Sequence, residues 1–384
     1  MVVGIVCYPT FGGSGVVATE LGIELSKKGY EIHFITYNQP VKLELLSNKV
    51  HYHEVMVPDY PLFHYQPYEL ALSTKVVDMV KKHKIELLHV HYAIPHAYAA
   101  FMAKNMLKSE GINIPVVTTL HGTDITLVGS HPSYKAAVEF SINQSDAVTA
   151  VSESLKNDTE ELFNINTDIS VIPNFINLEK YPVSKNDNNR GIIANSDEKI
   201  ICHISNFRKV KRIDDVVKTF YEINKKTPSK LMMVGEGPEK ENAENLCKKL
   251  KIEDKVYFFG NTTDTNNILS FSDLFLLTSS TESFGLAALE AMASYVPVIS
   301  TNAGGLPEVN ITGVSGYMSN VGDIDDMVKN SLEILSDDKT NNKFKENARK
   351  QAEIYDIHKI VPFYENIYIL ALNKVSKKWK ERIF

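Results

Sequence analysis

Residues 2–22 read VVGIVCYPTFGGSGVVATELG, which is an apolar run, a glycine-rich turn and a segment with helical spacing. A short strand that passes through a glycine turn into a helix is the opening unit of a doubly wound α/β sheet. Within it, Gly13 to Ala18 match the pattern G-x-G-x-x-A, in which backbone N–H groups and the helix dipole hold an anion. This stretch therefore predicts a fold class and a first candidate site.

The residues at the end of the second predicted strand limit which ligands the glycine turn can bind. Dinucleotide-binding sheets carry an acidic residue at the end of that strand to hold a ribose, and this chain has Asn38 and Gln39 there. A nicotinamide enzyme is therefore disfavoured, and a tight turn without any ligand stays as an alternative. The preferred interpretation is a small-anion site, for a carboxylate or a phosphate, at Gly13 and Ser14.

The alternation of β-rich runs and helical stretches continues along the whole chain. In the first half the predicted strands are 2–8, 31–37, 86–92, 114–120, 146–151 and 168–173. In the second half they are 199–206, 230–237, 255–261, 273–279 and 296–302. Near-continuous apolar strands separated by helices are typical of parallel sheets covered on both faces, so the sequence predicts two doubly wound, Rossmann-like domains.

Polar and turn-forming residues crowd together at 183–198, which makes this stretch the best candidate for a linker. The expected domains are 1–175 and 199–360, joined by a linker at 176–198. A C-terminal helix at 361–384 is expected to pack on one of the domains, for example back on the first. Because open α/β sheets bind ligands at the carboxyl ends of their strands, we expect the active site in a cleft between the domains.

Composition excludes several classes of protein. The 384 residues include 41 Lys and Arg against 47 Asp and Glu, a formal net charge of −6, which argues against nucleic-acid binding. No apolar run reaches the roughly 18 residues that span a bilayer. Cys7, Cys202 and Cys247 lie far apart without a CxxC pair, so we expect three reduced thiols in a soluble, cytoplasmic chain with no membrane partner.

Two carboxylates frame a second candidate site. Glu282 and Glu290 stand about two helical turns apart in ESFGLAALE, and both face the same way if the segment is helical. Backbone N–H groups of Phe284, Gly285 and Leu286 are expected to face a phosphate where a helix begins. Glu290 is placed to accept hydrogen bonds from the hydroxyls of a ribose. Two surface glutamates without a ligand are the alternative.

A basic loop follows the first strand of the second half. It reads SNFRKVKR at 205–212 and puts Arg208 and Lys211 at a strand end, where Lys and Arg suit a diphosphate. A solvated basic loop is the alternative. The glycine turn, the carboxylate pair and the basic loop all fall at strand ends, which favours a shared role.

These motifs carry a resemblance. SSTESFGL (279–286), EAMASYVPVISTNAGGLPEV (290–309) and GVSGYM (313–318) resemble the retaining nucleotide-sugar glycosyltransferases of the glycogen-synthase-like GT-B group. The glycine turn, the basic loop and four further motifs are similar to the branch of that group that opens bacillithiol biosynthesis. Those four motifs are HVHYAIPHAYAA (89–100), TTLHGTDIT (118–126), SDAVTAVSESL (145–155) and IPNFIN (172–177).

The resemblance implies transfer of N-acetylglucosamine from UDP-N-acetylglucosamine to the hydroxyl of L-malate, with retention and without a metal or other cofactor. It assigns the donor to the second domain and the acceptor to the first. Glu282 and His121 are implied at the transferred sugar as catalytic residues. The donor-binding residues it implies are Asn206, Arg208, Lys211, Asn261, Phe284, Gly285, Leu286 and Glu290. The group usually has arginine where Asn206 stands, so Arg208 is the expected replacement.

The acceptor candidates are residues at strand ends of the first domain together with the basic loop. They are Gly13, Ser14, Tyr92, Thr119, Asn174 and Arg208. Thr119 as an ordinary strand residue and Tyr92 as a core aromatic are the alternatives. His89, His91 and His96 are interpreted as structural, since a strand H-x-H plus one more histidine is a weak metal signal.

Other functions stay open at this point. They are a related transferase with an inositol phosphate or lipid acceptor, a nucleotide-sugar epimerase and a non-catalytic nucleotide-sugar binder. No N-terminal stretch has the basic amphipathic face that a lipid acceptor usually requires. The sequence also leaves open whether the chain forms a homo-oligomer.

Overall fold

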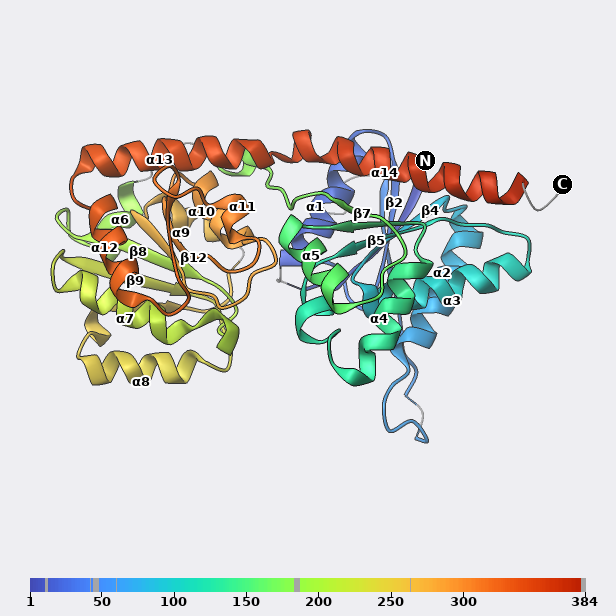
Figure 1. The fold of residues 1–384 in the computed structure, drawn as a ribbon, viewed down its shortest axis with the longest axis horizontal. Helices are drawn as coiled ribbons and strands as arrows, with labels where there is room; N and C mark the ends of the chain where they lie inside the picture. The colour runs from blue at the N-terminus through green and yellow to red at the C-terminus, as the bar shows by residue number, and fades with distance from the viewer. Residues whose placement is uncertain are drawn as a thin grey trace. The chain divides into compact units, whose positions relative to one another are not determined.

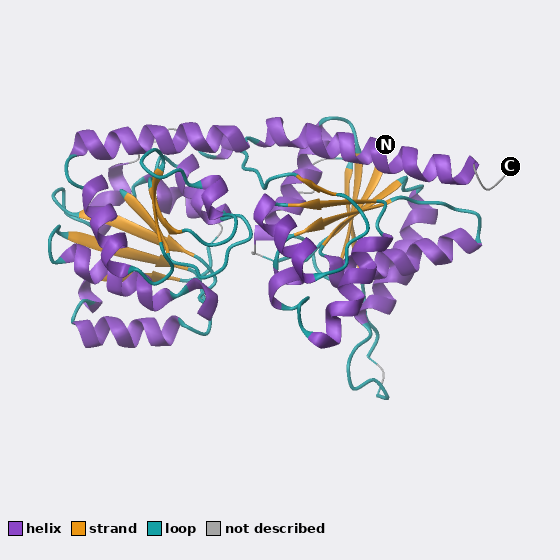
Figure 2. Ribbon diagram, in the orientation of Figure 1, coloured by secondary structure: helices purple, strands orange, loops and turns teal. Residues whose placement is uncertain are grey.

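The computed structural model describes residues 1–10, 13–41, 43, 48–59, 61–182, 187–262 and 264–380. The chain divides into two compact units (Figure 1). Unit 1 comprises Met1–Asn174 and Ile357–Phe384, and unit 2 comprises Phe175–Asp356. Each unit is a parallel sheet between layers of helices, as Figure 2 shows. The predicted α/β fold of two Rossmann-like sheets is confirmed.

The sheet of unit 1 has seven parallel strands in the order β3-β2-β1-β4-β5-β6-β7. Its central strands β1, β4 and β5 are almost wholly buried, because helices cover both faces. The strands are β1 (Val2–Val6), β2 (Glu31–Thr36), β3 (Val50–Glu54), β4 (Leu87–His91), β5 (Val116–Leu120), β6 (Ala147–Ala150) and β7 (Ile169–Val171). Strand β3 was not predicted, because VHYHE is a half-exposed edge strand without an apolar run.

Helices cover the two faces of this sheet in separate groups. Helix α1 packs on α14, while α3 packs on α2 and α4; Figure 1 shows these two groups on opposite sides of the strands. The helices of unit 1 are α1 (Gly13–Lys27), α2 (Tyr68–His83), α3 (Tyr98–Ser109), α4 (Pro132–Gln144), α5 (Glu153–Leu162) and α14 (Ile357–Lys380). Two short π-helical turns, η1 (Ala93–Ala97) and η2 (Thr123–Leu127), follow β4 and β5.

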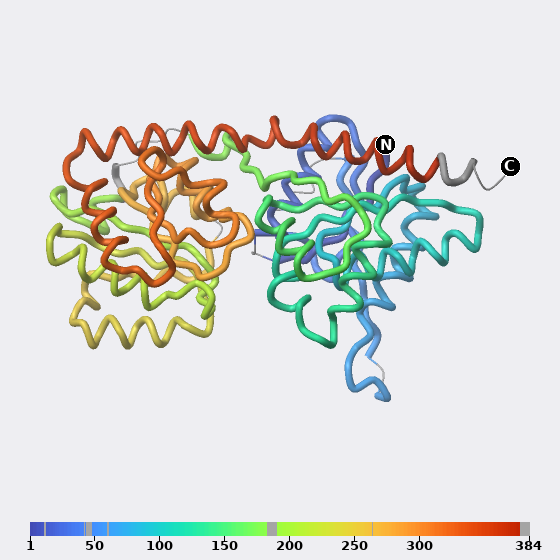
Figure 3. Tube along the Cα trace, in the orientation of Figure 1, coloured from blue at the N-terminus to red at the C-terminus, as the bar shows by residue number. Residues whose placement is uncertain are grey.

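The C-terminal helix α14 completes unit 1. Figure 3 shows this last helix returning to the first part of the chain, where it contacts α1, β5 and β6. Tyr364 and Tyr368 of α14 are fully buried, and the Tyr368 hydroxyl lies 2.7 Å from Nδ1 of His89 on β4. The Tyr30 hydroxyl donates to Glu365 at 3.0 Å. The chain therefore returns to its first unit after completing the second.

The sheet of unit 2 has six parallel strands in the order β10-β9-β8-β11-β12-β13. The strands are β8 (Lys199–Ile204), β9 (Ser229–Val234), β10 (Val256–Phe259), β11 (Leu274–Leu277), β12 (Val298–Thr301) and β13 (Gly316–Ser319). The short edge strand β13 was not predicted as a strand. It begins at Gly316, where a Cβ atom would come within 1.8 Å of the Val298 carbonyl oxygen.

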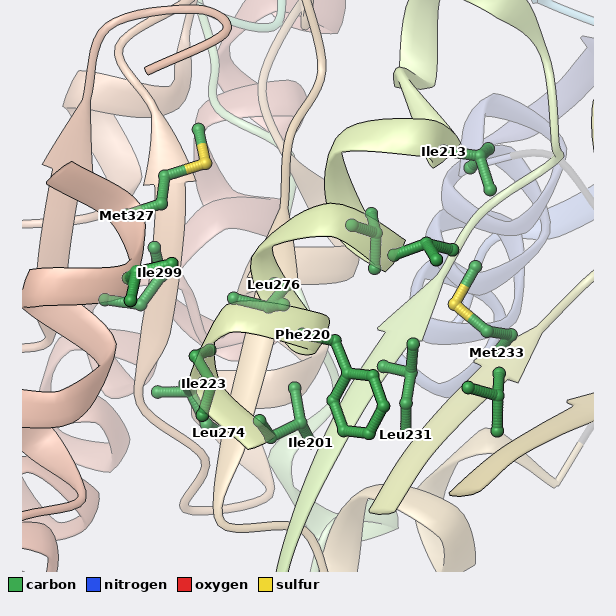
Figure 4. Close-up of a cluster of buried hydrophobic side chains, with 14 of the residues drawn as sticks. Ile201, Ile213, Phe220, Ile223, Leu231, Met233, Leu274, Leu276, Ile299 and Met327 are labelled. Atoms are coloured by element: carbon green, nitrogen blue, oxygen red, sulfur yellow. The ribbon is translucent and has the colours of Figure 1, made fainter. Parts of the chain in front are cut away.

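The core of unit 2 follows from helical periodicity. In α7, Ile213, Val216, Val217 and Phe220 recur on one face and are all buried. Figure 4 shows this face packed on apolar side chains of the strands. The helices are α6 (Asp187–Ile193), α7 (Ile213–Asn224), α8 (Lys240–Leu250), α9 (Thr265–Ser270), α10 (Leu286–Ala293), α11 (Leu306–Val309), α12 (Ile324–Ile334) and α13 (Asp338–Ala352).

The stretch expected to be a linker contains a short helix. Residues 183–186 lie outside the described residues, and the helix α6 follows them. Arg190 ties α6 to unit 2, because its guanidinium donates to the Phe271 carbonyl at 2.7 Å and to Asp273 at 2.9 Å. The nearby ammonium of Lys345 and this guanidinium keep the pKa of Asp273 below its usual range despite burial. A partly buried ion pair therefore attaches this helix to the rest of unit 2.

No helix in the described part of the chain is long and apolar enough to cross a membrane. Cys7, Cys202 and Cys247 are free and buried.

Candidate active site

In unit 1 the start of α1 contacts the end of β4. Phe11 and Gly12 of the glycine turn lie outside the described residues. Gly13 is exposed at the first position of α1, and the Ser14 hydroxyl lies 2.8 Å from the Tyr92 hydroxyl. The closest backbone approach falls at Gly15, where a Cβ atom would come within 2.5 Å of the Tyr8 carbonyl oxygen. The turn therefore presents Gly13, Ser14 and Tyr92 together at a helix start.

Tyr92 holds an unusual backbone conformation. Its φ is 86°, a region that bulky side chains rarely occupy and that is enriched at functional sites. The Tyr92 N–H donates to the Thr119 carbonyl at 2.9 Å, which fixes this geometry. Burial raises the pKa of Tyr92 to about 12, so its hydroxyl keeps its proton at neutral pH. Tyr92 can therefore both donate and accept a hydrogen bond.

Buried histidines line the carboxyl ends of β4 and β5. Nδ1 of His91 lies 2.8 Å from Nε2 of His121, and Nδ1 of His96 lies 2.5 Å from the His91 carbonyl oxygen. Burial lowers the pKa of His121 to about 3 and that of His96 to about 4, and it also lowers that of His91. These rings are therefore neutral at pH 7, and either His91 or His121 donates to the other.

Asp124 is a site residue that the sequence analysis did not single out. Its carboxylate accepts from the backbone N–H groups of Ala93 at 2.8 Å, Gly122 at 3.0 Å and His121 at 3.2 Å. It therefore ties the loop after β4 to the loop after β5. Burial raises the pKa of Asp124 to about 6 although these bonds lower it. The signal was present in HGTD, an acid three residues after the candidate histidine.

The remaining acceptor candidates of unit 1 have different surroundings. Thr119 is fully buried, and its hydroxyl lies 2.7 Å from both His89 Nε2 and the Thr149 hydroxyl. Thr119 therefore contacts buried side chains of neighbouring strands and is not exposed to a ligand. Asn174 is also buried, and its Oδ1 has no hydrogen-bond partner among residues that the structure describes. Leaving a buried carbonyl without a hydrogen bond is unfavourable, so Asn174 remains a candidate for contact with a ligand.

In unit 2 the ends of β8 and β11 bring a cation and a carboxylate together. The Lys211 ammonium forms an ion pair with Oε1 of Glu282, and the Ser279 hydroxyl donates to the same oxygen at 2.8 Å. The Thr278 hydroxyl donates to the Lys211 carbonyl at 2.9 Å, which holds the two loops in register. The Gly305 N–H donates to the Glu282 carbonyl at 2.9 Å. Hydrogen bonds from Ser279, Thr278 and Gly305 therefore hold the residues of this ion pair in place.

The basic loop carries the other donor candidates. Asn206 and Arg208 are exposed, while Phe207 between them is fully buried and anchors the loop. The neighbouring turn packs closely on this loop, since a Cβ atom at Gly237 would come within 2.5 Å of the Phe207 carbonyl oxygen. Asn261 is exposed just after β10. The anchored loop leaves its polar side chains accessible to an anion.

Helix α10 begins at the residues whose backbone N–H groups are expected to face a phosphate. It starts at Leu286 with Gly285 as its N-cap, so Glu282 lies in the preceding loop and only Glu290 is helical. Gly285 has φ of 101°, which favours glycine. The Phe284 ring is buried edge-on against Tyr355, with ring centroids 5.5 Å apart. Tertiary contacts, and not helical spacing, therefore place Glu282, while Glu290 is half-buried along α10.

Together the two units present complementary chemistry. Unit 2 has a helix start, a lysine and an accessible arginine, which suit a diphosphate, and carboxylates that suit sugar hydroxyls. Unit 1 has a helix start, a protonated tyrosine and a neutral histidine. Such groups bind and position polar substrates.

Known proteins share both halves of the chain. Residues 11–180 match the Glycosyltransferase Family 4 model, and residues 184–351 match the Glycosyl transferases group 1 model. N-acetyl-alpha-D-glucosaminyl L-malate synthase of Bacillus anthracis is 46% identical over 370 residues, covering 95% of this chain and 96% of that protein. The chain belongs to the family 4 glycosyltransferases. More distant relatives of this glycosyltransferase include the sulfoquinovosyl transferase SQD2 of Arabidopsis thaliana, 24% identical over 86% of this chain and 65% of that protein.

Solved structures show the same fold. Sucrose-phosphate synthase from Thermosynechococcus elongatus has a TM-score of 0.78 at 20% identity, covering 96% of this chain and 98% of that one. HepE from Anabaena, solved with UDP and glucose, has a TM-score of 0.79 at 18% identity, covering 95% and 98%. These likenesses agree with the predicted GT-B class of this glycosyltransferase.

Proposed function

We propose that this glycosyltransferase moves N-acetylglucosamine from UDP-N-acetylglucosamine to the hydroxyl of L-malate, with retention of configuration. The observation that carries the proposal is the 46% identity to N-acetyl-alpha-D-glucosaminyl L-malate synthase, because it extends over nearly the full length of both chains. The family models at 11–180 and 184–351 include the residues of both candidate sites. The geometry of each site supports a separate part of the reaction.

Unit 2 supplies the donor chemistry in this proposal. Lys211 and Arg208 bind the diphosphate, together with the N–H groups at the start of α10, Phe284 to Leu286. Glu290 accepts from the ribose hydroxyls, and Asn206 and Asn261 contribute polar contacts nearby. Glu282 contacts hydroxyls of the transferred sugar. The ion pair between Lys211 and Glu282 supports this division, since it puts the cation for the phosphate beside the carboxylate for the sugar.

Departure of UDP is the step that these cations assist. Negative charge grows on the diphosphate as the glycosidic bond breaks, and fixed positive groups aimed there lower the barrier. The malate hydroxyl then attacks C1 from the face that UDP leaves, and its proton passes to the departing phosphate oxygen. No protein nucleophile is invoked, because Glu290 serves the ribose in this assignment and Glu282 the sugar hydroxyls.

Unit 1 supplies the acceptor chemistry. Malate carries two carboxylates, and the N–H groups at Gly13 and Ser14 with the Ser14 hydroxyl suit one of them. The Tyr92 hydroxyl, 2.8 Å from that of Ser14, can donate to the same carboxylate, and Asn174 and Arg208 are further candidates. Neutral His121 is assigned to the transferred sugar, with its ring oriented by His91. Thr119 supports this site through His89.

The direct test is product analysis. The protein is incubated with UDP-N-acetylglucosamine and either L-malate, D-malate, an inositol phosphate or a diacylglycerol, and products are identified by mass spectrometry and anomeric NMR coupling. We expect an α-glycoside with L-malate. UDP release without a glycoside, a glycoside with another acceptor alone, or an altered sugar nucleotide without an acceptor would each contradict the proposal.

Transfer is expected to persist in excess EDTA. Arg208 and Lys211 provide the positive charge that a divalent ion provides in metal-dependent transferases. Loss of transfer with EDTA and its recovery with magnesium or manganese would contradict this assignment. We also propose a cytoplasmic location, since three buried free cysteines suit a reducing compartment.

A further inference from the structure

Four histidines gather at the edge of the unit 1 sheet, away from the residues assigned to transfer. His33 lies on β2, His51 and His53 lie on the edge strand β3, and His83 is the last residue of α2. The register pairs His33 with His51 and Ile35 with His53, which puts the three strand histidines on one face. The His83 ring approaches this face, with its centroid 4.5 Å from that of His33 and 4.8 Å from that of His53.

The ring nitrogens of this cluster converge. Nδ1 of His33 lies 2.8 Å from Nε2 of His53. One ligand atom from each of His33, His53 and His83 lies within 4.8 Å of the others. Nitrogen ligands on a tetrahedral zinc ion, at about 2.0–2.1 Å from it, stand roughly 3.3 Å apart. To hold a tetrahedral ion, the nitrogens of His33 and His53 must therefore open slightly from 2.8 Å, and any pair as far apart as 4.8 Å must approach.

One nitrogen of the cluster lacks a partner. Nε2 of His83 is buried without a hydrogen-bond partner in the described ranges. Leaving a buried imidazole nitrogen unpaired is unfavourable, and stacking of the rings does not satisfy it. A bound cation would supply the missing interaction.

A carboxylate stands behind the cluster. Oε1 of Glu31 lies 3.2 Å from Nε2 of His33, the nitrogen that faces away from His53. It also lies 3.4 Å from Nε2 of His51. Histidines that bind metals usually donate their second ring N–H to a carboxylate, which fixes the tautomer and raises the basicity of the ligating nitrogen. His33 and Glu31 have this arrangement.

The protonation state also suits metal binding. Burial is the largest cause that lowers the pKa of His33 and of His53 to about 4. Both rings are therefore neutral at pH 7, which is the form that ligates a metal. His53 and His83 are half-buried, so an ion can enter from solvent.

We propose that His33, His53 and His83 form a site for a divalent transition-metal ion, of which zinc is the best match, with Glu31 as the outer partner of His33. Three imidazoles favour zinc, copper or nickel over magnesium or calcium, which prefer oxygen ligands. The ion joins β2, β3 and the end of α2. Its role is structural, because Gly13, Ser14, Tyr92 and His121 belong to other loops of the unit.

The test measures zinc binding to the full chain without an added histidine tag. After removal of metal with a chelator, we expect one equivalent of Zn²⁺ to bind in calorimetric titration. His53→Gln and His83→Gln should each weaken binding at least a hundredfold, and Glu31→Gln ten- to a hundredfold. His64→Gln is the matched control, because His64 is exposed on the segment between β3 and α2, and it should bind zinc as the wild type does.

A second measurement does not depend on the variants. Co²⁺ added to the wild type should give the intense visible absorption of four-coordinate cobalt, which one equivalent of Zn²⁺ removes. Sugar-transfer activity of the variants verifies that they are folded. The proposal is overturned if the wild type binds no stoichiometric zinc, or if His53→Gln and His83→Gln bind it as tightly as His64→Gln.

Discussion

At the scale of single residues, Glu282 and Lys211 illustrate how the site is prepared for its ligand. Their ion pair is partly buried, and Ser279 shares the same carboxylate oxygen. In the proposed assignment, a diphosphate would compete for Lys211 and Glu282 would turn to sugar hydroxyls. These contacts hold both side chains at the strand ends of unit 2, and a group held in place loses little further freedom when it binds a ligand.

The first prediction separates the two carboxylates of the donor site. Glu282→Ala should chiefly lower kcat, on the order of a hundredfold or more, since Glu282 is assigned to the reacting sugar. Glu290→Ala should raise the KM for UDP-N-acetylglucosamine as well, because the ribose contact is made before and during the reaction. Steady-state kinetics with varied donor measure both effects. Near-wild-type kinetics for both variants would refute the assignment.

The second prediction concerns the hydroxyl pair of the acceptor site. Ser14→Ala and Tyr92→Phe should each lower kcat/KM for malate roughly ten- to a hundredfold, because each removes a hydrogen bond to a charged group worth about 1.5–3 kcal/mol. UDP affinity by calorimetry should be nearly unchanged. The double variant should lose less than the sum of the two losses, since both hydroxyls act on one carboxylate.

Gly13→Val tests the same turn sterically and should raise the malate KM. If Ser14→Ala and Gly13→Val instead lose UDP binding and keep malate saturation, the glycine turn is a nucleotide site.

At the scale of elements, α14 shows how a distant segment stabilises the first unit. The Tyr368 hydroxyl bonds to His89 across 279 residues of sequence, and His89 in turn bonds to Thr119. Lys374 near the end of the described helix donates to the Asp146 carbonyl at 2.9 Å. The core of unit 1 is therefore complete only when the C-terminal helix is in place.

The third prediction compares two aromatic residues of α14. Tyr368→Ala should lower the stability of unit 1 by about 3–5 kcal/mol, because Tyr368 is fully buried and its loss leaves a cavity and an unpaired His89 nitrogen. Phe363→Ala should change it by less than about 0.5 kcal/mol, since Phe363 is 52% exposed. Thermal and urea melts of both variants provide the measurement. Equal losses would show that α14 does not complete this core.

At the scale of the whole molecule, buried histidines are distributed unequally. His33, His89, His91, His96 and His121 are buried in unit 1, and His203 is buried in unit 2. Burial lowers the pKa of His203 to about 4 and that of His89 to about 3. The folded protein therefore keeps these rings neutral at pH values where an unfolded chain protonates them.

The fourth prediction is a selective loss of stability in acid. Histidine in an unfolded chain has a pKa of about 6.5, so below this pH the unfolded state binds protons that the buried rings of the folded state do not bind. The free energy of unfolding therefore falls as the pH falls towards about 4. Each buried histidine contributes up to about 1.4 kcal/mol per pH unit. Asp124, whose pKa is raised to about 6, has the opposite effect, because its carboxyl group takes up a proton more readily in the folded state and so adds stability as the pH falls. Unit 1 should therefore weaken more than unit 2.

Hydrogen exchange at pH 7 and pH 5, corrected for the intrinsic effect of pH, measures this difference. Peptides from β4 and β5 should lose more protection than peptides from β8 and β9. Equal losses in both units would contradict the argument.

The sequence by itself determined the order of strands and helices and the loops that carry the motifs. Apolar runs such as β11 (LFLL), and the glycine turn at the start of α1, are local signals, because periodicity and backbone freedom are properties of adjacent residues. The two edge strands escaped this reasoning. Strand β3 is rich in histidine and half-exposed, and β13 is short and opens with glycine, so neither presents an apolar run.

Only the tertiary structure decided which of these residues meet. The Ser14 and Tyr92 hydroxyls are 78 positions apart in sequence, and the Lys211 and Glu282 side chains are 71 apart. Glu282 lies in the loop before α10, where Lys211 and Ser279 contact its carboxylate, and Glu290 lies in the helix. Asp124 became a site residue because burial joined its carboxylate to two loops. Such contacts depend on the packing of whole strands and helices, which no short stretch of sequence encodes.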